Sequence, residues 1–130
     1  ALRVVVTHQP LMVVEREDRR DLVRGHAAAI RAWAGAGADL FLSGHTHQSF
    51  VAPVLGAKRR AWVVQTGTAV SSRVREHVPN SVHLIEWAGD ASRHGWTVER
   101  LDWAGERFAT VARTVIPPPA DDRSLVPEMV

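Results

Sequence analysis

Three histidines in the first half of the sequence have the spacing of metal ligands. His8 directly follows one short apolar segment, and His45 and His47 directly follow another. Neutral imidazole is the most common protein ligand for zinc and related divalent ions. Gly44 lets the backbone turn closely, and the i, i+2 spacing lets two rings point into one cavity. The three histidines are therefore candidate metal ligands, whereas His8 taken alone is more typical of a polar cap at a strand end.

The segments around these histidines predict a βαβ unit. Residues 2–7 and 39–43 are short apolar runs that are typical of buried strands. Between them, residues 19–34 carry apolar side chains at helical spacing, which predicts an amphipathic helix. A strand, a helix and a strand with short connections favour parallel pairing of the two strands. The three histidines would then lie at one carboxyl edge of the sheet, where open α/β sheets place their ligands.

The second half of the sequence predicts a mostly antiparallel sheet. Turn signals rich in Pro, Gly, Asn and Asp separate short apolar runs. The expected strands are residues 49–52, 60–65, 81–87, 96–103 and 107–114. The predicted fold class is therefore α/β (α+β), with a βαβ unit followed by a mostly antiparallel sheet.

Two of these strands carry more detailed predictions. Residues 81–87 have large apolar side chains on both faces, which predicts that other parts of the protein cover this strand on both sides. In residues 96–103 the apolar alternation slips between Val98 and Leu101, which indicates a bulge or an edge. The five tryptophans fall on the apolar helix face or in expected strands, so we interpret them as core residues rather than as platforms for base stacking.

Length and composition exclude several classes of protein. The 130 residues fit one domain, and 45% hydrophobic with 23% charged residues is typical of a soluble globular protein. Since there is no cysteine, disulfide scaffolds, thiolate nucleophiles and Cys-based zinc sites are excluded. No apolar run reaches the ~20 residues of a membrane span, and we expect a cytoplasmic protein. The net charge of +2 gives little support for a nucleic-acid partner.

Two segments resemble a known family. VVVTHQP, followed by the predicted helix and then DLFLSGHTHQ, closely resembles the last two signature blocks of the calcineurin-like metallophosphoesterases. Residues 66–87 are similar to the cyclic-nucleotide-phosphodiesterase-like branch of that superfamily. The resemblance implies half of a four-layer α/β/β/α sandwich and hydrolysis of phosphodiesters, including cyclic nucleotides, or of phosphomonoesters. It also implies a binuclear centre of Mn, Fe or Zn ions, with His8 and His45 on one ion and His47 on the other.

The sequence also departs from this family. The Asp-x-His, Gly-Asp-x-x-Asp and Gly-Asn-His blocks, which supply the bridging carboxylate, an Asn ligand and the catalytic histidine, are absent. We therefore expect residues 1–114 to be the carboxyl-terminal half of a metallophosphoesterase domain, followed by a Pro-rich extended or disordered tail over residues 115–130. This half would have no catalytic residue of its own, would hold at most one weakly bound ion, and would be inactive alone.

The expected partners follow from this interpretation. They are a phosphoester substrate and the missing half, another chain, or further copies in a homo-oligomer. A noncatalytic half-domain that serves association and a mononuclear three-histidine metal-binding domain are the two alternatives.

Charged residues near the expected site give weaker signals. Arg73 and Arg75 are candidate substrate-binding residues, because guanidinium groups suit phosphate oxygens, with solvated surface arginines as the alternative. His26 is expected to be a core or capping residue. The nearby acids are expected to lie on a solvated loop and helix start, or, for Asp39, at the far end of its strand. These acids are Glu15, Glu17, Asp18, Asp21 and Asp39.

Overall fold

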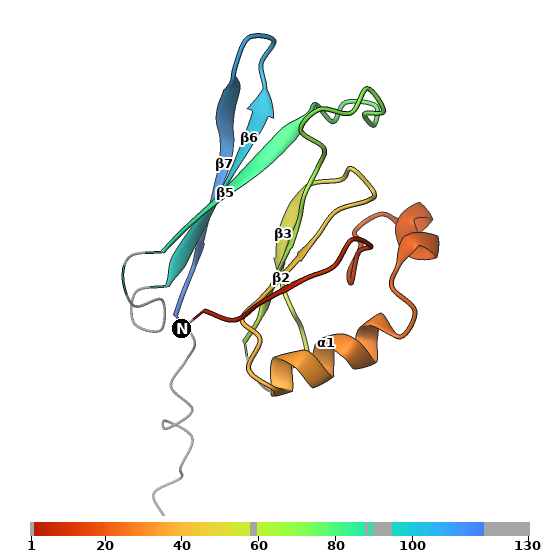
Figure 1. The fold of residues 1–130 in the computed structure, drawn as a ribbon, viewed down its shortest axis with the longest axis vertical. Helices are drawn as coiled ribbons and strands as arrows, with labels where there is room; N and C mark the ends of the chain where they lie inside the picture. The colour runs from red at the N-terminus through yellow and green to blue at the C-terminus, as the bar shows by residue number, and fades with distance from the viewer. Residues whose placement is uncertain (1, 58–59, 88, 90–94, 119–130) are drawn as a thin grey trace, which may run out of the picture.

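The computed structural model describes residues 2–57, 60–87, 89 and 95–118. Seven strands, one α-helix and one 3-10 helix lie within these residues (Figure 1). In chain order they are β1 (Val4–Val6), the 3-10 helix η1 (Arg16–Asp21), α1 (His26–Gly35), β2 (Leu40–Ser43), β3 (Phe50–Pro53), β4 (Trp62–Gln65), β5 (Ser81–Trp87), β6 (Trp96–Trp103) and β7 (Phe108–Ile116). No helix in the described ranges is long and apolar enough to cross a membrane.

The first sheet contains the predicted βαβ unit. Its strand order is β1-β2-β4-β3. β1 pairs in parallel with β2, as predicted, and β2 pairs in parallel with β4, whereas β3 runs antiparallel to β4. The carboxyl ends of β1, β2 and β4 therefore meet at one edge, which is the edge that His8 and the segment after Ser43 follow.

The second sheet is antiparallel, in the order β5-β6-β7. The register between β6 and β7 shifts between Arg100 and Leu101, inside the stretch where the apolar alternation predicts a bulge or an edge. The extra residue, Val111, belongs to β7, whereas β6 keeps an unbroken register with β5 from Trp96 to Asp102. β7 continues to the buried Ile116, past the predicted strand end at Thr114. The expected tail beyond residue 118 lies outside the described residues.

The elements form three layers, a helix, a sheet and a second sheet (Figure 1). α1 packs on one face of the first sheet, in a core of Leu11, Ile30, Ala34, Ala38, Phe41, Ala61 and Val63. The opposite face contacts the second sheet through Leu40, Val64, Trp96, Val98 and Ile116. β2 is buried on both faces, which explains its continuous apolar run. The predicted α/β class is confirmed.

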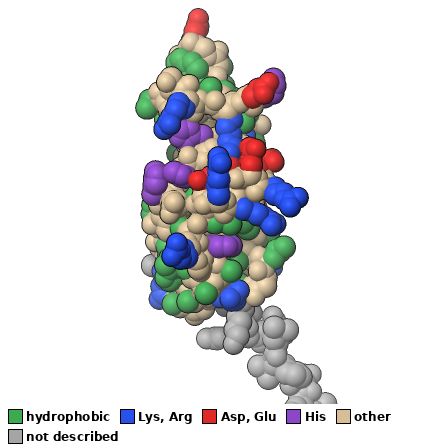
Figure 2. All heavy atoms as spheres, turned by 90° about the vertical axis from the view of Figure 1, so that its right-hand side faces the viewer, with side chains coloured by type: hydrophobic (Ala, Val, Ile, Leu, Met, Phe, Trp, Pro, Cys, Tyr) green, Lys and Arg blue, Asp and Glu red, His purple; other side chains and the backbone are tan. Residues whose placement is uncertain are grey.

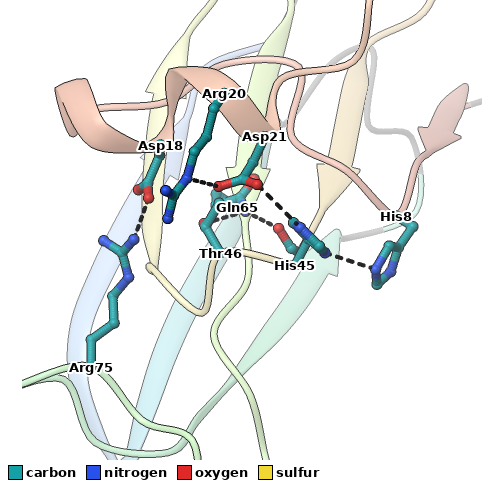
Figure 3. Close-up of polar contacts among 9 residues, drawn as sticks. His8, Asp18, Arg20, Asp21, His45, Thr46, Gln65 and Arg75 are labelled. Atoms are coloured by element: carbon teal, nitrogen blue, oxygen red, sulfur yellow. Dashed lines mark hydrogen bonds and ion pairs between the residues drawn. The ribbon is translucent and has the colours of Figure 1, made fainter.

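The prediction of one helix over residues 19–34 is wrong. The segment forms η1 and α1, separated by an extended Leu22 and by Gly25 in the left-handed region at φ 77°. The break is held in place because the Val23 N–H donates to the Pro10 carbonyl at 2.9 Å. Only glycine adopts the Gly25 conformation without steric cost. A single helix therefore does not continue through this position, and α1 begins at the next residue. As a result η1 lies beside the carboxyl edge of the first sheet (Figure 3).

Two predictions about cover on the second sheet are also wrong. Leu84 and Trp87 of β5 are 46% and 54% exposed, so the described residues do not cover this strand on both sides. Trp96 is a core residue as predicted, but Trp33, Trp87 and Trp103 are exposed. Leu84 and Trp103 lie on the face of this sheet that no layer covers in the described part of the chain. Trp87 lies on the covered face, opposite the buried Trp96, but at the end of its strand. Trp103 instead packs against Phe108, with ring centroids 5.3 Å apart.

Candidate metal centre

The structure brings the three predicted histidines together at the carboxyl edge of the first sheet. All three line one open cavity of about 630 Å³. The rest of its lining is Gly67, Thr68, Ala69 and Arg73, from the loop after β4. The predicted convergence on one rim is therefore found in three dimensions, and it follows from the parallel pairing of β1 with β2.

His8 and His45 face each other directly. The His45 Nδ1 and His8 Nε2 atoms are 3.0 Å apart, and the ring centroids are 4.9 Å apart in an edge-to-face arrangement (Figure 3). Two ligand atoms that each lie about 2.1 Å from one ion and subtend about 90–110° are about 3.0–3.4 Å apart. The two nitrogens are at the distance of a hydrogen bond between the rings, and the same separation fits two ligands of one divalent cation.

The ring of His47 is held in a defined tautomer. Its Nδ1 is 2.6 Å from the Arg73 carbonyl oxygen. Since a carbonyl only accepts, Nδ1 carries the hydrogen, and the lone pair lies on Nε2. A backbone carbonyl bonded to the remote ring nitrogen is a common support for a metal-binding histidine. His47 therefore also fits the role of a ligand, through Nε2.

The backbone at these histidines is unusual. His45 and His47 have φ angles of 72° and 57°, in the left-handed region that residues with a side chain rarely adopt. Such backbone costs about 1 kcal/mol or more per residue and is frequent at functional sites. The intervening Thr46 is buried, and the turn is held by Gln65, whose side-chain amide donates to the Gly44 carbonyl and to the Thr46 hydroxyl.

Gln65 is a structural residue of the site that we did not predict. Its side chain is fully buried at the end of β4, where it also accepts a hydrogen bond from the Ser43 hydroxyl. The sequence signal that could have indicated its role is a polar residue at the end of an otherwise apolar strand. Because every side-chain polar atom of Gln65 bonds to the turn after β2, it fixes the path of the segment that carries His45 and His47.

Two of the nearby acids are not solvated as we expected. Asp21, the last residue of η1, places Oδ1 3.5 Å from the His45 Nε2 atom (Figure 3). Asp18 is only 3% exposed and forms an ion pair with the Arg75 guanidinium. The expectation was wrong because the break before Gly25 turns η1 toward the histidines. Asp39 lies at the far end of its strand as expected, where it accepts from the Arg3 backbone N–H at 2.9 Å.

The two predicted substrate-binding arginines occupy different places. Arg73 is an exposed residue that lines the histidine cavity. Arg75 contacts Asp18 and, at 3.8 Å, Glu17, and it does not line the cavity. His26 begins α1, and its Nδ1 donates to the Leu11 carbonyl at 3.0 Å, so it ties the helix to the preceding loop and does not cap it.

Replacing Arg75 by alanine is expected to lower the free energy of unfolding by about 2 kcal/mol, because the buried Asp18 carboxylate would lose its partner. The exposed Arg24 offers a control, since Arg24→Ala should change the stability by less than about 0.5 kcal/mol. Urea unfolding of both variants measures the difference. If the two substitutions cost the same, the Arg75–Asp18 pair does not stabilise η1. Adding Asp18→Asn to Arg75→Ala should recover part of the loss.

The ligand set is incomplete in the described part of the chain. There, no group of three His, Cys, Asp or Glu side chains converges closely enough to hold an ion. Figure 2 shows histidine, acidic and basic side chains on the face of the molecule that it presents. The site thus combines two facing imidazoles, a third imidazole on the same cavity, one carboxylate beside them and an arginine on the rim.

The fold and the site define a mixed α/β protein with two sheets and a histidine cluster at a sheet edge. No protein-family model matches the chain, and no curated protein matches it. Among solved structures, it is similar to Vps29 from Entamoeba histolytica, which was crystallised with Zn²⁺, at a TM-score of 0.49 and 19% sequence identity. The likeness covers 72% of this chain and 47% of the Vps29 chain, so this chain spans about half the length of that protein.

Proposed function

We propose that this chain supplies part of the binuclear metal centre of a phosphoester hydrolase. The observation that carries the proposal is the convergence of His8, His45 and His47 on one cavity, with His8 and His45 at a separation suited to one ion. The sequence supports it independently, because Gly44-His45-Thr46-His47 stands directly after a buried parallel strand. The proposed substrates are phosphodiesters, including cyclic nucleotides, or phosphomonoesters.

Each residue of the site has a separate task in this proposal. His8 and His45 would hold one ion, and His47 would hold the other through Nε2. Ions held there would supply polarisation of the phosphoryl group and a lowered pKa of water. Arg73 lies on the rim of the same cavity, where its guanidinium can bind phosphate oxygens. Arg75 has a stabilising role instead, because it is engaged with Asp18.

The remaining ligands are proposed to come from a complementary polypeptide segment. Two divalent ions carry four positive charges, and neutral imidazoles offset none of them, so carboxylates are needed. β1 is an edge strand of the first sheet, and its Val4 and Val6 are 43% and 71% exposed. A second cavity of about 510 Å³, which Val6, His8 and Leu42 help to line, lies beside this edge. A strand that paired with β1 would cover these valines and bring its own side chains next to His8.

The exposed edge also favours a second candidate function. The chain would then be a noncatalytic module that associates through β1, with a partner or with copies of itself, and the histidines would hold at most a structural ion. A mononuclear three-histidine site is the remaining alternative, which metal analysis distinguishes by its stoichiometry of one ion.

Hydrolysis of bis-p-nitrophenyl phosphate with added Mn²⁺ tests the proposal. The chain alone should show no turnover, and turnover should appear when a polypeptide with the aspartate-rich blocks is added. His45→Ala in the mixture should remove it. A complex that forms without turnover would support the associating module instead. Efficient turnover by the chain alone would contradict the need for a complementary segment.

A further inference from the structure

We infer that Asp21 is a positioning residue for the metal ligand His45. The inference rests on the proposed function and adds a residue to it. Asp21 Oδ1 lies 3.5 Å from the His45 Nε2 atom, while His45 Nδ1 faces His8 on the other side of the ring (Figure 3). The imidazole of His45 therefore lies between the Asp21 carboxylate and the Nε2 atom of His8.

This arrangement selects one tautomer of His45. A carboxylate only accepts, so it favours the tautomer in which Nε2 carries the hydrogen. The lone pair then lies on Nδ1, the atom 3.0 Å from His8 Nε2. The 3.5 Å separation is longer than a hydrogen bond, and such contacts often tighten when the ligand binds. Asp21 thus prepares His45 to bind an ion through Nδ1.

The support of His45 mirrors that of His47. The Arg73 carbonyl holds the hydrogen of His47 on Nδ1, and Asp21 holds the hydrogen of His45 on Nε2. Both rings carry left-handed backbone and line the same cavity. Opposite tautomers present different ring nitrogens, which lets two histidines only two residues apart serve neighbouring positions in one cavity. A carboxylate or carbonyl behind a metal-binding histidine raises its basicity and fixes the orientation of its ring.

The position of Asp21 is built into the fold. It ends η1, whose Asp18 is anchored to the loop after β4 by Arg75. Its own side chain is 29% exposed, and the Arg20 guanidinium lies 3.8 Å away from its other oxygen. The carboxylate therefore has one oxygen toward Arg20 and one toward His45.

Zn²⁺ titration calorimetry on the full chain compares three variants. Asp21→Ala should weaken Zn²⁺ binding about 10–100-fold. Asp21→Asn keeps an oxygen acceptor, so it should bind Zn²⁺ within about fivefold of the parent chain, because positioning rather than charge is at stake. Glu15→Gln removes one negative charge from the exposed start of the same segment and should bind like the parent. An equal loss in Asp21→Asn and Asp21→Ala would overturn the inference in favour of a direct ligand or a charge effect.

A second measurement needs no metal and separates this inference from the proposed function. ¹⁵N NMR of the imidazoles near about pH 8, where free histidine is neutral, reports which ring nitrogen carries the hydrogen. His45 should show the Nε2–H tautomer in the parent chain and a mixture in Asp21→Ala, whereas His47 should stay Nδ1–H in both. If this difference is seen but the mixture with the complementary polypeptide shows no turnover, the proposed function fails and the positioning role stands. If Zn²⁺ binds and the His45 tautomer does not respond to Asp21→Ala, the positioning role is wrong.

Discussion

Replacing His45 by alanine is expected to weaken Zn²⁺ binding by the chain at least about 100-fold, a larger loss than that of a supporting residue. The reason is geometric. His45 Nδ1 lies 3.0 Å from His8 Nε2, so its loss removes one of the two facing nitrogens. His8→Ala should have a similar effect, because either substitution leaves a single imidazole on that side of the cavity.

The exposed His77 provides a matched control for this experiment. Its side chain is 89% exposed and contacts Glu76. His77→Ala should therefore leave the Zn²⁺ affinity unchanged, as measured by titration calorimetry at constant pH. Wild-type affinity in His45→Ala, or an equal loss in His77→Ala, would show that zinc binds elsewhere on the chain.

The chain is expected to lose up to about 3 kcal/mol of stability between pH 6.5 and pH 4 through one residue, His83. Its two ring nitrogens are buried and have no hydrogen-bond partner among the described residues. Burial, and to a smaller extent the neighbouring Arg100, lowers the pKa of His83 to about 4, although Asp102 opposes the shift. Above pH 6.5 the ring is neutral in both states. As the pH falls toward 4, the unfolded chain takes up the proton first, so folding becomes less favourable.

His83→Leu tests this pH dependence, since it removes the titrating group. Leucine places an apolar side chain on the same face of β5 as Ile85. Urea unfolding at pH 7 and at pH 4.5 should show a smaller loss for His83→Leu than for the parent chain. His77→Leu removes an exposed histidine and should keep the parent's pH dependence. A parent chain equally stable at both pH values would mean that His83 has an ordinary pKa in the folded state.

The sequence predicted those parts of the structure that depend on local pattern. The strands over residues 81–87 and 96–103 have the predicted bounds, and the slip in apolar alternation lies at the observed register shift. Parallel pairing and the meeting of the three histidines followed from two apolar strands joined through a helix. The prediction that the first of these strands is buried was wrong, because β1 is an edge strand whose Val4 and Val6 are exposed. These features are predictable because side-chain period and strand direction follow from a few neighbouring residues.

The features that the sequence did not predict depend on contacts between residues far apart in the chain. Asp18 is buried by a partner 57 residues later, Arg75, and the apolar periodicity of residues 19–34 contains no sign of that pair. Asp21 could be placed near His45 only once the break at Gly25 was known. The exposure of Trp87 and Trp103 likewise depends on which layers cover the second sheet, and a strand's own sequence does not determine this.

The loop after β4 fastens two sides of the site within three residues. The Arg73 carbonyl holds the ring of His47, and the Arg75 side chain holds Asp18 and with it the 3-10 helix that ends in Asp21. Detaching this loop would therefore release both histidine supports at once. The shape of the histidine cavity therefore depends on this one loop, far along the chain from His8 and from η1.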